Sequence, residues 1–361
     1  MKTVLMNPGP VVLSERVRKS MLQPDLCHRE SEFVELQNKI RADLLKVYAL
    51  DEKEWASIVF TGSGTSALEG MLTSLVPAHG KILIVENGVY GERMRRIAEI
   101  HGIDHVVLHH EWGDAIDMEK LKGELNYHQE ISHIGVVHHE TTSGRLNDIE
   151  AIATLCKQRG NVSILLDAVS SFGAENIPFN DWHIAACAAT ANKCLHGVPG
   201  TSFVIANRDA VKQMTATPAR TLYLDLITYL KNQEANGTPF TQSIQTFYGL
   251  AEALDELQEE GGWQARQQLY WQRMDGVRDA LMGMGVKPYL EKDECSCVLN
   301  AFYLPDGISY EQLHDELKQA GFVIYAAQGG FAKAMFRISC MGDMSADDLK
   351  RFKTAFETII H

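Results

Sequence analysis

From Ser57 onward, short apolar runs alternate with longer amphipathic stretches. The runs that are typical of buried strands cover residues 57–60, 81–85, 134–137 and 163–166. Residues 65–75 and 149–159 instead carry their apolar side chains at helical spacing. Strands that alternate with helices usually form a parallel sheet with helices on both faces. The pattern therefore predicts an α/β fold with a mostly parallel sheet between helices.

Two further helical stripes lie outside this alternating region. Apolar residues recur at helical spacing over 33–48, directly after Ser31, a residue type that caps helix N-termini well. A second stripe follows Phe240 and ends at the pair Gly261-Gly262. We take this glycine pair as the boundary between two domains. The expected domains are a large one over 1–260, which includes the N-terminal segment, and a small one over 261–361.

The last hundred residues have a different pattern. Residues 297–302, 322–325 and 335–338 are expected to be strands. Ser309 and Ser345, each followed three residues later by Gln or Asp, are expected to open helices. The small domain is therefore predicted to be a compact α+β unit.

Composition narrows the class of protein. The chain has 361 residues, 45% of them hydrophobic, which is enough for a sizeable core. Its formal net charge of -13 argues against a nucleic-acid-binding protein, which needs a basic surface. The apolar run at the N-terminus is too short for a signal peptide, so we expect a cytoplasmic protein.

Cysteine and histidine spacing indicates neither disulfides nor a metal. The seven cysteines include no CxxC pair, so reduced thiols are expected. The doublets His109-His110 and His138-His139 lack the i, i+4 spacing of helix-borne metal ligands. We therefore expect no metal.

A glycine-rich turn follows the first predicted strand. In Thr61-Gly62-Ser63-Gly64-Thr65 the chain passes from strand to helix, where free backbone NH groups and the helix dipole favour an anion such as phosphate. The same residues match the dinucleotide motif G-x-G-x-x-A, with Glu86 about twenty residues further on. A tight turn with no ligand is the third interpretation.

Two charged residues follow successive apolar runs. Asp167 ends one run and Lys193 follows the next, so both should lie at the carboxyl edge of one sheet, where α/β proteins bind ligands. A plain ion pair is one interpretation. The other is pyridoxal phosphate, with Lys193 forming a Schiff base and Asp167 keeping the ring nitrogen protonated. The turn from Gly62 to Thr65 would then hold the phosphate.

Arg337 is the fourth candidate. It lies between Phe336 and Ile338 in a predicted strand of the small domain. Its planar guanidinium suits a carboxylate or a phosphonate, although a surface arginine at a sheet edge fits the sequence equally well.

Seven stretches taken together carry a resemblance to a known family. They are "NPGP", "FTGSGTSALEG", "VENGVYGERM", "VVHHETTSG", "LLDAVSSFG", "ANKCLHGVPG" and "FRISCMG". In this order they resemble the class V aminotransferases, which are fold type I pyridoxal phosphate enzymes. The likeness covers nearly the whole chain and is strongest to the branch that acts on 2-aminoethylphosphonate with pyruvate as acceptor.

The resemblance implies a set of site residues. Ser63, Gly64 and Thr65 would bind the cofactor phosphate, Tyr90 would stack on the pyridine ring, and Thr142 would lie near the ring hydroxyl. Asp167 would meet the ring nitrogen, and Lys193 would be the Schiff-base lysine. Thr241 would reach the phosphate of a neighbouring subunit, which implies a homodimer. Arg337 would take the anionic group of an aminophosphonate substrate.

This chain also departs from the transaminase pattern. Such transaminases carry a smaller residue at the position of His139, a proline-containing loop in place of Gln242-Ser243-Ile244, and a Gly-Lys in place of "AAQGG". A related ammonia-lyase, which converts 1-hydroxy-2-aminoethylphosphonate to phosphonoacetaldehyde and ammonia, resembles the chain too. Elimination needs an acid near the leaving hydroxyl, and His28, Arg29 and His139 are the candidates. A dinucleotide-dependent dehydrogenase is the more distant alternative.

Overall fold

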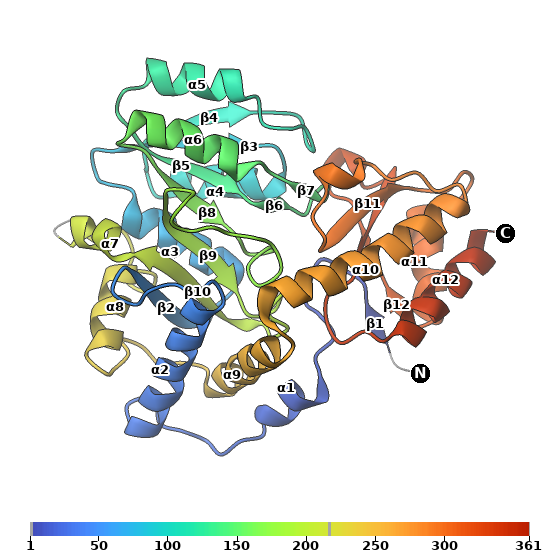
Figure 1. The fold of residues 1–361 in the computed structure, drawn as a ribbon, viewed down its shortest axis with the longest axis horizontal. Helices are drawn as coiled ribbons and strands as arrows, with labels where there is room; N and C mark the ends of the chain where they lie inside the picture. Colours follow the sequence, from blue (N-terminus) through green and yellow to red (C-terminus); the bar gives the residue numbers. More distant parts are fainter. Residues whose placement is uncertain (1–2, 216–217, 361) are drawn as a thin grey trace.

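The computed structural model describes residues 3–215 and 218–360. A seven-stranded sheet forms the centre of the larger part of the molecule (Figure 1). Its strands, in spatial order, are β2 (Trp55–Gly62), β10 (Gly200–Asn207), β9 (Ile184–Thr190), β8 (Ser163–Asp167), β5 (Ile131–Val137), β3 (Lys81–Glu86) and β4 (His105–His109). Only β10 runs antiparallel to its neighbours in this sheet, so the prediction of a mostly parallel sheet is confirmed.

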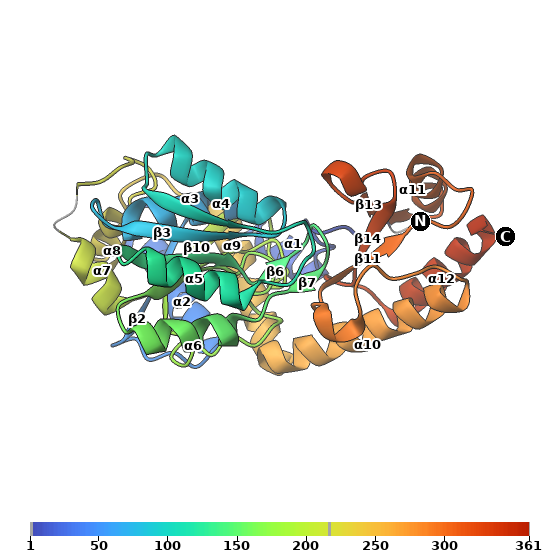
Figure 2. The same cartoon turned by 90° about the horizontal axis from the view of Figure 1, so that it is seen from above.

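Helices cover both faces of this sheet (Figure 2). One face packs against α3 (Gly64–Leu75), α4 (Val89–Ile100), α7 (Arg208–Met214) and α8 (Leu226–Glu234). The other packs against α2 (Ser31–Lys46), α5 (Met118–Tyr127), α6 (Ile149–Arg159) and α9 (Ile244–Glu259). Neighbouring strand residues face opposite ways, so Ile84 lies in the first core and Val85 in the second. Because both faces of the sheet are buried, consecutive residues of each strand are apolar and the strands appear in the sequence as continuous apolar runs.

The smaller part is built on a three-stranded antiparallel sheet. Its strands, in spatial order, are β11 (Leu299–Tyr303), β14 (Met335–Ser339) and β13 (Tyr325–Ala326). The helix α10 (Gly262–Gly283) leads to this part from the larger one, and α11 (Tyr310–Gln319) and α12 (Ala346–Ile360) complete it (Figure 1). The predicted α+β character of the C-terminal region agrees with these elements.

The first residues of the chain pack with its last third. Strand β1 (Val4–Leu5) pairs in parallel with β12 (Phe322–Val323), and Val4 and Met6 are buried in the core of the smaller part. The chain then returns to the larger part through α1 (Glu15–Ser20). The domain boundary at residue 261 stays a prediction. The contacts of β1 place the start of the chain against the part that follows this boundary. No helix in the described residues is long and apolar enough to cross a membrane.

Two of the three predicted helix N-caps are confirmed, and the third is wrong. Ser309 caps α11 by accepting from the amide of Gln312, and Ser345 and Asp348 bond each other's amides at the start of α12. The cap expected at Ser31 is wrong, because Glu30 takes the extended N-cap conformation and Ser31 is already helical. The strand expected over 322–325 is also interrupted, since β12 pairs with β1 whereas β13 pairs with β14.

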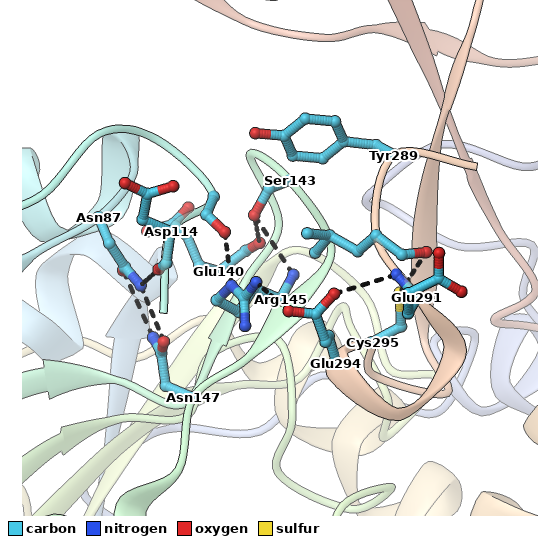
Figure 3. Close-up of polar contacts among 12 residues, drawn as sticks. Asn87, Asp114, Glu140, Ser143, Arg145, Asn147, Tyr289, Glu291, Glu294 and Cys295 are labelled. Atoms are coloured by element: carbon cyan, nitrogen blue, oxygen red, sulfur yellow. Dashed lines mark hydrogen bonds and ion pairs between the residues drawn. The ribbon is translucent and has the colours of Figure 1, made fainter. Parts of the chain in front are cut away.

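Polar contacts join the two parts near the ends of the central strands (Figure 3). Arg145, in the short strand β7 (Arg145–Leu146), forms an ion pair of 2.7 Å with Glu294 of the smaller part. The hydroxyl of Tyr289 donates to the carbonyl of Trp112 at 2.9 Å. β7 pairs with β6 (His139–Glu140), so this junction adjoins the loop that carries Thr142.

A second junction is centred on the buried carboxylate of Glu175, in the loop after β8. One of its oxygens accepts from the Ser296 hydroxyl at 2.6 Å and from the Cys297 amide at 2.9 Å. The other oxygen accepts from the side chain of Gln267, on α10, at 2.9 Å. Glu175 therefore holds together the loop after β8, the connecting helix and the segment that leads into β11.

We predict that Glu175→Ala lowers the free energy of unfolding by about 2–4 kcal/mol, because it leaves buried donors without an acceptor. Urea unfolding followed by circular dichroism measures the change. Glu35→Ala, at an exposed position of α2, is the matched control and should have little effect. Equal stability of the two variants would contradict the assignment of Glu175 as a junction residue.

Candidate active site

Lys193 lies three residues beyond β9, at the carboxyl edge of the central sheet. Its amine donates to the carbonyl of Pro8, and a side chain at Gly9 would place Cβ 2.7 Å from Lys193 Cδ. The N-terminal "NPGP" segment therefore lies directly against the lysine, and glycine at position 9 leaves it room. Burial lowers the pKa of Lys193 to about 8, although part of the residue remains accessible.

Asp167 ends β8, the strand parallel and adjacent to β9, as the sequence predicted. Its carboxylate is buried and accepts from the amide of Val169 at 3.0 Å. Burial raises the pKa of Asp167 to about 6, while the positive charges of Arg93 and Lys193 act in the opposite direction. No ion pair within the described residues joins Asp167 to Lys193. The interpretation of the two as a plain ion pair is therefore not supported.

The glycine-rich turn lies between β2 and α3. Ser63 is the N-cap of α3, but its side chain makes no capping hydrogen bond. In the described hydrogen bonds, the amides of Gly64 and Thr65 donate to no protein atom. A Cβ at Gly64 would lie 2.9 Å from Val169 Cγ1, so glycine lets the turn approach the loop after Asp167. Free amides at a helix N-terminus make this turn an anion cradle close to Asp167.

The dinucleotide interpretation of the same turn is wrong. β2, which leads into the turn, is an edge strand of the sheet, whereas the dinucleotide motif follows a central strand. Glu86, the proposed ribose ligand, is buried and already bonded to Arg95 at 3.0 Å and His109 at 3.3 Å. This carboxylate is therefore used within the chain.

A fully buried carboxylate that the sequence did not single out orders two of the candidate residues. Glu140 accepts from the amide of Tyr90 at 3.2 Å and from the hydroxyl of Thr142 at 2.6 Å. Gly88 passes so close to Glu140 that no side chain fits there. Burial raises the pKa of Glu140 to about 7. The sequence could have indicated this role, because a carboxylate inside the short motif "HETTSG" is buried only when it has hydrogen-bond partners.

Arg337 is buried in β14, the central strand of its sheet, so the interpretation as a surface arginine is wrong. Its guanidinium donates to the carbonyls of Thr141 at 2.8 Å and of Ala326 at 2.8 and 3.0 Å. The described ion pairs include no carboxylate partner for it. Burial is the main cause of the lowered pKa of Lys193, and the charge of Arg337 acts in the same direction. Three of its five N–H groups are used, which leaves two for an anion.

His139 has a fixed tautomer. Its Nδ1 lies 3.0 Å from the carbonyl of Ser170, so Nδ1 must carry the proton and donate it. Burial lowers the pKa of His139 to about 4, and the charge of Lys193 adds to this. The ring is therefore neutral at pH 7, and Nε2 carries a lone pair. This Nε2 is buried and without a partner, as are Thr141 Oγ1 and Asn7 Oδ1.

No described hydrogen bond or ion pair joins three other candidates to this group. His28 and Arg29 belong to the loop between α1 and α2, and no described hydrogen bond or ion pair connects them to Lys193 or Asp167. Thr241 is exposed in the segment before α9, and no described hydrogen bond involves its side chain. Within this chain the structure therefore groups Ser63 to Thr65, Tyr90, Thr142, Asp167, Lys193 and Arg337, with His139 beside them.

We predict that the amine of Lys193 reacts with a small acylating reagent with half-maximal rate near pH 8. The neutral amine is the reactive form, and burial disfavours the charged form, so reactivity should rise at lower pH than for a free lysine of pKa about 10.4. Labelling of the cofactor-free protein, followed by mass spectrometry of the peptide with Lys193, measures the profile. An unstructured peptide of the same sequence is the control. A midpoint near that of the peptide would contradict the prediction.

Known proteins resemble this chain over nearly its whole length. The chain matches the family "Aminotransferase class-V" over residues 18–352. Proteins of Bacillus cereus (strain ATCC 14579) and Bacillus anthracis named 2-aminoethylphosphonate--pyruvate transaminase are each 36% identical to it over 352 residues, with 96% of this chain and 95% of each relative covered.

Solved structures show the same fold. An aspartate aminotransferase of Thermus thermophilus superposes with a TM-score of 0.90 at 26% identity, over 99% of both chains. An alanine--glyoxylate aminotransferase of Nostoc sp. gives a TM-score of 0.92 at 23% identity, over 100% of this chain and 96% of the other.

Proposed function

Because the chain belongs to the class-V aminotransferase family, we propose that it transfers the amino group of 2-aminoethylphosphonate to a keto acid such as pyruvate. The enzyme class is that of a pyridoxal phosphate-dependent transaminase. The donor and acceptor are proposed from the names of the relatives and from the charge of the site. Phosphonoacetaldehyde and alanine would be the products.

The residues of this chain fit pyridoxal 5′-phosphate. The free amides of the turn from Ser63 to Thr65 suit its phosphate. The buried Asp167 suits the ring nitrogen, and the unpartnered atoms of His139 and Thr141 are polar groups that a bound molecule could satisfy. When bound, this cofactor supplies an aldehyde that takes up amino groups and a ring that withdraws electrons.

Lys193 would first bind the cofactor through its amine and then transfer protons to and from the substrate. With a pKa of about 8, a minor but usable fraction of the amine is neutral at pH 7 and can act as a base, and the protonated form can return the proton. It would remove the proton from the amine-bearing carbon of the donor. Tyr90 would lie against the ring and Thr142 beside the ring hydroxyl, both ordered by Glu140.

The proposed substrate is inferred mainly from Arg337. This arginine is a buried cation without a carboxylate partner in the described ion pairs, it donates to the carbonyl of Thr141 beside Thr142, and it has two free N–H donors. A buried charge without a counter-ion is costly, so this site favours an anionic ligand. The phosphonate of the donor and the carboxylate of pyruvate both meet this requirement, because a guanidinium binds either group.

We also propose a homodimer. Thr241 is exposed and makes no described hydrogen bond in its own chain, which supports a role for its hydroxyl at a partner's cofactor phosphate. The neighbouring Gln242 is bonded to Thr61 of its own chain, which would hold the segment in place.

The alternative reaction is elimination of ammonia from 1-hydroxy-2-aminoethylphosphonate. It needs an acid beside the leaving hydroxyl. His139 does not suit this role, because its ring is neutral and its free nitrogen is an acceptor. No described hydrogen bond or ion pair joins His28 or Arg29 to Lys193 or Asp167. These observations favour amino transfer.

We predict that the purified enzyme forms alanine from 2-aminoethylphosphonate and pyruvate without releasing ammonia. Lys193→Ala should reduce the rate by about 100-fold to 10,000-fold or more, because the proton-transfer group is lost. Coupled assays for alanine and for ammonia measure both outcomes. Catalytic release of ammonia from 1-hydroxy-2-aminoethylphosphonate without any keto acid would instead support elimination.

We further predict that Arg337→Gln raises the KM for both 2-aminoethylphosphonate and pyruvate by about tenfold to 100-fold, since a charge-assisted contact is lost. Steady-state kinetics measure KM and kcat separately. Arg96→Gln, at an exposed position of α4, is the control and should leave KM unchanged. An unchanged KM in Arg337→Gln would rule out this residue as the anion ligand.

A further inference from the structure

Arg93 bridges the aromatic candidate and the anion cradle. It lies on α4, one turn beyond Tyr90, and its guanidinium carbon is 4.7 Å from the centre of the Tyr90 ring. One of its nitrogens, Nη1, donates to the hydroxyl of Thr65 at 3.2 Å. Thr65 belongs to the first turn of α3, so the guanidinium is held between the two helices, directly beside the glycine-rich turn.

The charge of Arg93 is not neutralised by a carboxylate in the described residues. Arg95, on the same helix, forms ion pairs with Glu86 and Glu99, whereas the described ion pairs include none for Arg93. Burial raises the pKa of Asp167, and the charge of Arg93 opposes that rise. Because an arginine side chain stays protonated, a permanent positive charge acts on this site.

The anion cradle needs such a charge. A phosphate monoester carries about −1.5 to −2 charges at pH 7, and a helix N-terminus offers the equivalent of about +0.5. The hydroxyls of Ser63 and Thr65 add donors but no charge. Most of the phosphate charge would therefore be uncompensated by the turn itself. Among the described residues, Arg93 is the cation hydrogen-bonded to this turn.

We propose that Arg93 is a ligand of the cofactor phosphate. Its described hydrogen bonds use one of five N–H donors, so the guanidinium keeps donors for phosphate oxygens. The Tyr90 ring and the Thr65 hydroxyl fix the plane of the guanidinium before the phosphate binds. The inference rests on the proposed function in taking pyridoxal phosphate as the cofactor, and it does not depend on the amine donor.

The test compares ligands with and without the phosphate group. Cofactor-free protein is titrated with pyridoxal phosphate, with pyridoxal and with inorganic phosphate, and binding is followed by calorimetry. Arg93→Gln should weaken binding of pyridoxal phosphate by at least about tenfold, because a charge-assisted contact is lost. It should also weaken binding of inorganic phosphate while leaving the affinity for pyridoxal unchanged. Arg93→Lys should retain part of the phosphate affinity, since it keeps the charge but not the planar fork.

Two controls separate this role from a structural one. Arg95→Gln removes a charge from the same helix and should leave all three affinities unchanged. Melting temperatures of the cofactor-free variants check folding. Equal losses for pyridoxal phosphate and pyridoxal in Arg93→Gln would overturn the proposal, because Arg93 would then act through Tyr90 alone. Unchanged binding of both phosphates would overturn it too.

The outcome is distinguishable from a failure of the proposed function. If the unaltered protein bound no pyridoxal phosphate, the cofactor assignment would fail, and the titration with inorganic phosphate would still report whether Arg93 binds a phosphate. If it bound the cofactor but did not use 2-aminoethylphosphonate, the donor assignment alone would fail.

Discussion

The parallel pairing of β8 with β9 is the constraint on which the rest of the site depends. It brings Asp167 and the turn carrying Lys193 to one edge of the sheet, although 25 residues separate them in the sequence. Burial raises the pKa of the acid and lowers that of the amine, although part of Lys193 remains accessible. The sheet therefore provides two groups whose proton affinities have been moved toward neutral pH, where proton transfer is most useful.

Burial of polar groups around this edge is costly unless each group has a partner. Glu140 has several, and it orders Tyr90 and Thr142 as a result. Arg337 and His139 are only partly satisfied by the chain, with free donors on the one and a free lone pair on the other. Such groups are what a site built for an anionic, polar ligand requires, and the pattern is consistent with a class-V aminotransferase.

The site also depends on contacts between parts of the chain that are far apart in sequence. Arg337 reaches the carbonyl of Thr141 from the smaller part, and the "NPGP" segment meets Lys193 through Pro8. The ion pair of Arg145 with Glu294 holds the same two parts together (Figure 3), as does Glu175 through its bonds to Ser296 and Cys297. The relative position of the two parts therefore sets how far Arg337 lies from Lys193.

The sequence by itself determined β2, β3, β5 and β8, the helices α2, α3, α6 and α9, and the order of the chemistry-bearing residues, because periodicity and short motifs are local properties. It did not single out β4 or the antiparallel β10. Asp167, Lys193 and the turn at Gly64 could be placed at one edge from this alone. Tertiary structure decided the rest. The burial of Arg337, the tautomer of His139 and the contact of Arg93 with Thr65 each depend on an atom from another element. No local pattern encodes such a pairing, since its energy arises only when distant segments exclude water together.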